Sequence, residues 1–185
     1  MKIEKHLAQN KAPIVGRWLD LIFETYPDDA QRFLRKQKDR FANPVGTTIS
    51  KEIENLYDEV IKGLEPDRVS PILDRIIRIR AIQDFSPSQA VNFIFLLKKA
   101  IRLETSADML KGQPVEDLTI IESRIDNLAL LAFDIYMQCR EKLYDIRANE
   151  TKNRVSRLLQ RAGLISEIQD NQPDIEHRGK NQKPS

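Results

Sequence analysis

The sequence predicts an all-α fold, a bundle of about six helices that ends in a long C-terminal helix. Apolar residues recur three and four positions apart over most of the 185 residues, which is the spacing of a helix with one buried face. Proline, asparagine, serine and glycine stand where these runs begin and end, as expected of helix boundaries. No segment alternates apolar and polar residues as a strand would.

The N-terminal part of the chain predicts two helices. The first has apolar residues at Leu7, Ile14, Trp18, Leu21 and Ile22, and Pro13 either bends it or marks a restart. The segment Tyr26-Pro27-Asp28-Asp29 reads as the boundary before a short second helix. Phe33 and Leu34 are expected to face inward from that helix.

The middle of the chain has clearer helix signals. Asn43-Pro44 and Gly63 delimit a helix over 44–63. The next helix starts at Pro66 or at Ser70-Pro71. Ser86 and Gln89 are expected to form a capping box, with Pro87 at the first helical position. One helix is expected to follow it, with the apolar surface Val91, Phe93, Ile94, Leu96 and Leu97.

Three segments resemble the RsbRD-type N-terminal domain over roughly residues 5–105. They are Trp18–Leu21 leading to Tyr26-Pro27, Arg32–Leu34 followed by Asp39–Gly46, and Arg78–Ala90. The resemblance implies a haem-free, globin-like fold that senses or scaffolds in front of signalling modules, notably in the RsbR-like co-antagonists of the stressosome. Those proteins carry a STAS domain, whereas a long helix and a polar tail follow residue 105 here, so we expect no output domain.

The last helix is predicted over 114–162 and carries a heptad seam. The seam consists of Leu118, Ile121, Ile125, Leu128, Ala132, Ile135 and Cys139. Leu130, Leu131 and Phe133 widen it. Two interpretations stay open: the helix closes the core of its own bundle, or it forms a homodimer through this seam. The resemblance favours the dimer, because the related sensor domains are thought to pair through helices.

Domain organisation is predicted as one helical domain over 1–165, in which 147–165 is a projecting helical extension. A solvated helix face is the ordinary explanation for the basic bias of that extension, and docking onto an acidic signalling or complex partner is the functional one. The candidate docking residues are Arg147, Arg154, Val155, Leu158 and Leu159. Residues 166–185 are expected to form a disordered polar tail.

Composition limits the classes of partner. The formal net charge is +2, so no global field attracts nucleic acid, and no run approaches the roughly 20 apolar residues of a membrane span. A cytoplasmic protein is expected. Cys139 is the single cysteine, either a buried structural thiol or a redox switch.

The sequence offers no catalytic machinery. Its histidines are His6 near the start and His177 in the tail, neither of them expected on a core helix, so no internal histidine is available to ligate haem. No Cys/His spacing suits zinc, and no glycine-rich loop follows a strand. We therefore expect no enzyme activity, no cofactor and no metal.

The remaining polar group of interest is Arg78, Arg80, Gln83 and Asp84, at the end of an otherwise apolar helix. These side chains either tie down the unpaired carbonyls of a helix terminus or form a small polar pocket with Trp18 or Tyr57. The function predicted overall is a non-catalytic regulator in bacterial-type signal transduction and stress response, acting as a homodimer on an unidentified partner. The alternatives are a small-molecule sensor that uses the vacated haem pocket and an accessory subunit of a larger complex.

Overall fold

The computed structural model describes residues 2–36, 41–83, 85–105 and 115–163. Within these ranges all regular secondary structure is helical, which confirms the predicted all-α class. The chain divides into two units, Met1–Tyr144 and Asp145–Ser185, and each is described by itself. The expected disordered tail lies outside the described residues.

Helices α1 (Lys2–Gln9) and α2 (Lys11–Phe23) are separated at Asn10. The backbone N–H of Asn10 donates to the His6 carbonyl, and its side-chain amide donates to the same oxygen over 2.9 Å. Pro13 lies in the first turn of α2, where a missing N–H costs nothing, so the chain restarts before Pro13 and is not bent there. Contrary to expectation, His6 lies on a core helix, because Ile3 and Leu7 of α1 are fully buried.

Helix α3 (Asp28–Lys36) leads to α4 (Pro44–Lys62), whose cap is Asn43. The Asn43 side chain accepts from the Gly46 N–H over 2.9 Å and donates to the Leu34 carbonyl over 3.1 Å. A Cβ at Gly46 would lie 2.3 Å from the Asn43 amide nitrogen, so this cap requires glycine there. Leu34 is buried as predicted, but the inward placement of Phe33 was wrong: it is 52% exposed.

Helix α5 (Pro66–Ile82) begins at Pro66 and continues through Pro71. The capping box of Ser86 and Gln89 then opens α6 (Pro87–Asn92) as predicted. The single helix expected after it is broken, because Phe93–Phe95 form a turn before α7 (Leu96–Glu104). In that turn the Ile94 and Leu97 N–H groups each bond three residues back, which leaves the Phe93 carbonyl free.

The indole N–H of Trp18 takes up that free carbonyl over 2.6 Å. Both groups are buried, and a buried polar group without a partner costs about 1–3 kcal/mol. The turn and the tryptophan therefore stabilise one another across 75 residues of sequence. No local signal in the α6 sequence marks this break.

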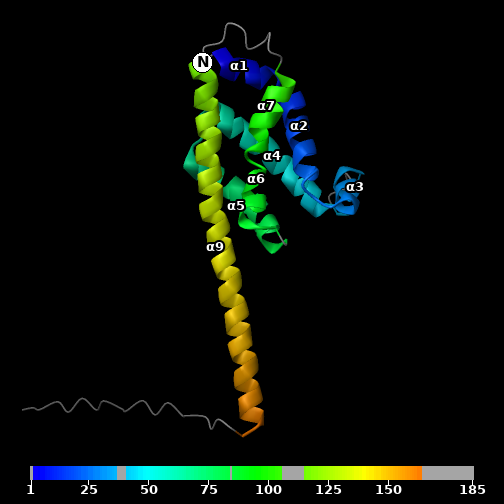
Figure 1. The fold of residues 1–185 in the computed structure, drawn as a ribbon, viewed down its shortest axis with the longest axis vertical. Helices are drawn as coiled ribbons and strands as arrows, with labels where there is room; N and C mark the ends of the chain where they lie inside the picture. The colour runs from blue at the N-terminus through cyan, green and yellow to red at the C-terminus, as the bar shows by residue number, and fades with distance from the viewer. Residues whose placement is uncertain (1, 37–40, 84, 106–114, 164–185) are drawn as a thin grey trace, which may run out of the picture. The chain divides into compact units, whose positions relative to one another are not determined.

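Helix α9 (Val115–Arg161) is the long final helix. Within the first unit, its residues up to Tyr144 lie beside α1, α4, α5 and α7 (Figure 1). The Arg124 guanidinium donates to the carbonyls of Val60 and Ile61 over 3.1 and 3.0 Å and pairs with Glu4. Lys98 of α7 pairs with Asp126 over 2.7 Å, so the start of α9 is tied to three helices.

Candidate functional site

The buried guanidinium of Arg80 is the centre of the polar cluster that the sequence singled out. Arg80 is 0% exposed near the end of α5. Its Nε donates to the Ala90 carbonyl over 3.0 Å and its Nη2 to the Gln89 carbonyl over 3.1 Å. These carbonyls belong to the last turn of α6, which ends too early to supply them with helical partners. Arg80 therefore caps the C-terminus of a neighbouring helix.

Aromatic and hydroxyl groups complete the surroundings of Arg80. Its Nη1 donates to the Tyr26 hydroxyl over 3.3 Å, and the Phe85 ring centre lies 4.4 Å from the guanidinium carbon. Burial lowers the pKa of Arg80, and the nearby Tyr26 opposes that shift; an arginine stays protonated at neutral pH regardless. Among the described residues no carboxylate pairs with it, so carbonyl dipoles and ring faces stabilise the cation.

The other residues of the predicted polar pocket are dispersed. Gln83 joins Arg80, because its Oε1 accepts from the Tyr26 hydroxyl over 3.2 Å. Arg78 is on the surface and pairs with Asp74 over 2.6 Å. Tyr57 is buried and donates to the Leu7 carbonyl over 2.9 Å.

Trp18 contacts neither Arg78 nor Arg80 through a hydrogen bond, since its indole bonds to Phe93 as described. Asp84 lies outside the described residues. Tyr26, Thr25 and Phe85 around Arg80 were not predicted, because only the tertiary fold brings the turn after α2 and the segment before α6 to this side chain. The aromatic Tyr26 before Pro27 is visible in the sequence, but it was interpreted as a helix boundary and as part of the family resemblance, and not as a partner of Arg80.

An open groove of about 820 Å³ lies among α2, α3 and α4. Its lining is mixed: the apolar side chains of Val15, Leu19, Phe23 and Leu34 lie there together with polar and charged ones such as Asp20, Arg35, Lys51 and Glu54. Gly16 also lines it, and a Cβ built there would meet nothing within 4 Å. A helical glycine costs about 1 kcal/mol relative to alanine, and here neither backbone conformation nor packing requires it. A single glycine inside a helical pattern was the signal that could have found this groove.

The two faces of α9 within the first unit differ sharply. Ile121, Ile125, Leu128 and Ala132 of the predicted seam are 0% exposed and belong to the core. The remaining seam residues, Leu118, Ile135 and Cys139, are partly buried against that core. The seam is therefore used inside the protomer.

A second apolar surface lies on the other side of α9. We call it the outer face; it consists of Leu130, Phe133, Met137 and Tyr144, which are 67, 45, 39 and 56% exposed. Met137 and Tyr144 also line a hollow of about 490 Å³ shared with Phe85–Pro87 and Gln89. Arg140 crosses this hollow, with its guanidinium 4.9 Å from the Tyr144 ring centre.

The Cys139 thiol is half-buried beside the core. Burial raises its pKa and Asp74 adds to that effect, whereas Arg78 and Lys142 oppose it. The thiol is therefore protonated at neutral pH, and protonated thiols are poor nucleophiles. This environment favours the interpretation of Cys139 as a structural thiol over a redox switch.

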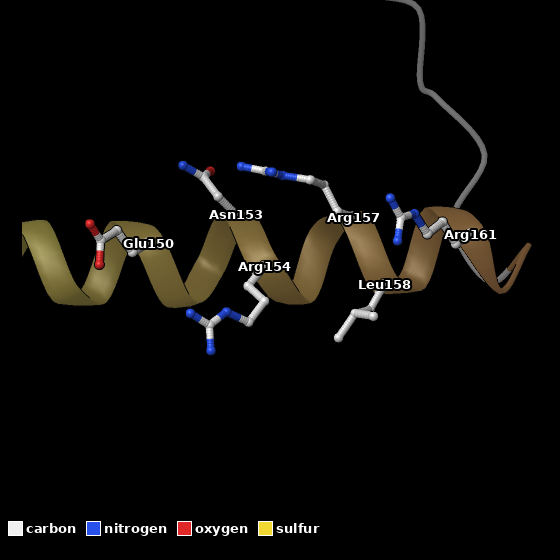
Figure 2. A pocket seen from close by; sticks show the side chains of 6 residues that line it. All are labelled: Glu150, Asn153, Arg154, Arg157, Leu158 and Arg161. Carbon is white, nitrogen blue, oxygen red and sulfur yellow. The ribbon is translucent and has the colours of Figure 1, made fainter.

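The candidate docking residues lie on the second unit, at the end of α9. Arg147, Arg154, Val155 and Leu158 are exposed, and Leu159 is half-buried. Figure 2 shows Arg154 and Leu158 pointing to one side of the helix and Asn153 and Arg157 to the other. In the described part of the chain, no group of three or more His, Cys, Asp or Glu side chains is placed to hold a metal ion. Across the same ranges, no helix has both the length and the hydrophobicity needed to cross a membrane.

These features define an all-helical domain, in which buried polar side chains secure helix ends and one helix carries an exposed apolar face. The family model described as the RsbT co-antagonist protein rsbRD N-terminal domain matches residues 12–151. The chain belongs to this family of stressosome-related regulatory signalling domains. The match confirms the resemblance and extends it beyond residue 105 into α9. No curated protein and no solved structure matches the chain.

Proposed function

We propose that the protein is a non-catalytic regulator that acts as a homodimer in the cytoplasm, and that the outer face of α9 forms the dimer interface. The observation that carries this proposal is the exposure of Leu130, Phe133, Met137 and Tyr144 on a helix whose other side closes the core. Four large apolar side chains along one helix face are unusual on the surface of a monomer. The central residues of the predicted seam are buried in the protomer, which favours the outer face over the seam for this role.

The hollow beside Met137 and Tyr144 supports the same interface. A pair of helices that cross at their outer faces brings side chains of one protomer toward the hollow of the other, because a two-fold interface uses the same patch on both subunits. The volume of about 490 Å³ accommodates an aromatic side chain such as Phe133. Packing of protruding side chains into such recesses is what distinguishes a specific interface from a flat contact.

The substitution Phe133→Glu tests this proposal. A carboxylate in an apolar interface is desolvated without a partner, so the dimer dissociation constant is expected to rise at least about 100-fold. Sedimentation velocity over a range of protein concentrations gives that constant. The matched control is Ile120→Glu. Ile120 is 42% exposed on the same helix, but its side chain points about 140° away from that of Phe133 around the helix axis. A wild-type chain that is monomeric at about 100 µM, or equal weakening by both substitutions, refutes the interface.

A small-molecule sensor is the second candidate function, favoured by the groove over Gly16. An occupant there would approach the α2 backbone directly, which is a known use of glycine. The interior near Trp18 and Tyr57 is a weaker candidate for a ligand site, because both side chains are buried and already hydrogen-bonded within the protein. Native mass spectrometry of the protein from its own cells tests this function: a bound compound that is lost in Gly16→Leu supports it, and an unliganded mass argues against it.

A further inference from the structure

In the described residues of the second unit, one helix has an exposed surface on all sides. Residues 145–161 are helical, and all except the half-buried Leu159 are exposed. These residues continue α9, and helices in proteins draw most of their stability from the packing of one face, so a partner that covers one face stabilises this part of α9. The question is which occupant fits this segment.

The apolar residues of the segment follow the spacing of a coiled-coil seam. Ala148, Thr151, Val155 and Leu158 alternate by three and four residues, which places them at successive a and d positions. We call these four residues the distal stripe. Val155 and Leu158 are 47 and 58% exposed, so the distal stripe is open to a second helix.

Basic residues flank the distal stripe. In the same register Arg147, Arg154 and Arg161 occupy successive g positions, and Lys152 occupies an e position. Residues 147–161 contain five basic side chains against the single acidic Glu150. Within the described part of the chain, none of the three g-position arginines forms an ion pair. Residues at e and g set partner choice in coiled coils.

A second copy of the chain is a poor occupant of the distal stripe. In a parallel pair each g residue faces the e residue of the next heptad, which brings Arg147 to Lys152 of the other copy. In an antiparallel pair g faces g, which brings arginine to arginine. Both arrangements oppose like charges, and this is the device by which helices reject a wrong partner.

We infer that the distal stripe binds an amphipathic helix of a different protein, with apolar residues at a and d and Glu or Asp at e and g. Such a helix covers Val155 and Leu158 and pairs with the flanking arginines. Nucleic acid is a weaker fit, because phosphate binding does not require an apolar stripe. An acidic membrane surface is also a weaker fit, since Ala148 and Thr151 supply little of the bulky apolar surface that interfacial helices insert. This inference rests on the proposed role as a regulator that acts through protein contacts, and it names the chemistry of the partner.

A designed probe tests the inference with the full chain. The probe is a fluorescent peptide of about three heptads with Leu at a and d and Glu at e and g, and the control peptide carries Lys at e and g. Fluorescence anisotropy is expected to show at least tenfold tighter binding of the Glu peptide. Failure of the Glu peptide to bind overturns the inference.

The matched variants are Arg154→Glu and Arg157→Glu. They change the net charge equally and lie three residues apart, but Arg154 points to the same side as Leu158 and Arg157 to the other (Figure 2). Arg154→Glu is expected to weaken peptide binding about threefold or more, as the loss of one flanking charge pair predicts, and Arg157→Glu by less. Equal effects mean that only diffuse positive charge attracts the peptide, and they refute the inference.

Two further measurements separate the outcomes. Tighter binding of duplex DNA or of phosphatidylglycerol vesicles than of the Glu peptide overturns the choice of a protein partner. Sedimentation velocity on the same samples reports the homodimer independently. If the chain is dimeric but does not bind the Glu peptide, only this inference is refuted. If the chain is monomeric and binds the Glu peptide, only the proposed dimer is refuted.

Discussion

Replacing the buried Arg80 tests how the core tolerates a positive charge that has no carboxylate partner. Arg80→Met keeps an unbranched apolar stem but shortens the side chain and removes its donors and its charge. Arg80→Lys keeps the charge but replaces the planar fork by one ammonium group. In the native fold the fork spans the carbonyls of Ala90 and Gln89 at 3.0 and 3.1 Å, and a single ammonium cannot reproduce that geometry.

The magnitude follows from the two carbonyl bonds. A hydrogen bond from a charged donor contributes about 1.5–3 kcal/mol, and the contacts to the Tyr26 and Thr25 hydroxyls at 3.3 and 3.5 Å add less. Part of this lost stability is regained, because the substitution also removes the cost of burying a charge. We expect Arg80→Met to lower the free energy of unfolding by about 2–4 kcal/mol. Arg80→Lys is expected to lower the free energy of unfolding by about 3–5 kcal/mol, because the buried charge remains but cannot make all of the hydrogen bonds of the guanidinium.

Urea denaturation followed by the fluorescence of Trp18 measures these changes. Trp18 is the single tryptophan of the chain and is 0% exposed, so its emission reports loss of the core. Arg78→Met is the control, since Arg78 is two residues away, exposed, and paired with the surface residue Asp74; its expected effect is within about 0.5 kcal/mol. An Arg80→Met chain as stable as the wild type would falsify the reasoning, because the desolvation cost of the cation would then equal the value of its bonds.

Two smaller predictions concern α4 and α2. Glu52 is 5% exposed and burial tends to raise its pKa, but hydrogen bonds from Arg75 at 2.8 Å and from Asn55 lower it overall, below 4.5. A carboxyl with a depressed folded-state pKa stabilises the fold above its unfolded pKa and loses that effect as the pH falls. Glu52→Gln should therefore cost about 1–3 kcal/mol at pH 7, and urea midpoints should show this difference shrinking below pH 4.5; a constant difference contradicts the linkage. Gly16→Ala should raise the free energy of unfolding by about 0.5–1 kcal/mol, since the added Cβ meets nothing within 4 Å; a loss of stability in thermal denaturation would show that this space is not open in solution.

Local signals predicted the helices whose ends are determined by their own residues. Asn43-Pro44 and Gly63 delimit α4 as expected, and the Ser86–Gln89 box opens α6. The break at Phe93 was not predictable in this way, because its stabilising partner is Trp18, 75 residues away. Helical periodicity continues through the turn, so the apolar pattern alone favours one uninterrupted helix.

In the candidate sites too, the sequence predicted local features but not the partners that tertiary packing supplies. The sequence correctly marked the Arg80 region as polar and close to a helix end, but the carbonyls it caps belong to α6 and not to its own helix. Both apolar faces of α9 are visible in the sequence. Which one is buried depends on the helices that pack against it, and tertiary packing placed Ile121 and Ile125 inside and Leu130 outside. Phe33 was misplaced because the short helix α3 has only one side in contact with the rest.

The long-range polar links of the core share a chemical asymmetry. Trp18, Tyr57 and Arg80 each donate from a side chain to a main-chain carbonyl, for example that of Phe93 or Leu7. Every residue type supplies such an acceptor, so substitution at the receiving position leaves the link intact, whereas substitution of the donor destroys it. Correlated changes at two positions, the usual trace of a spatial contact in evolution, cannot arise from these links. Contacts inferred from covariation would omit the bonds that hold the helix ends of this domain together, although those of Trp18 and Tyr57 join residues 75 and 50 positions apart.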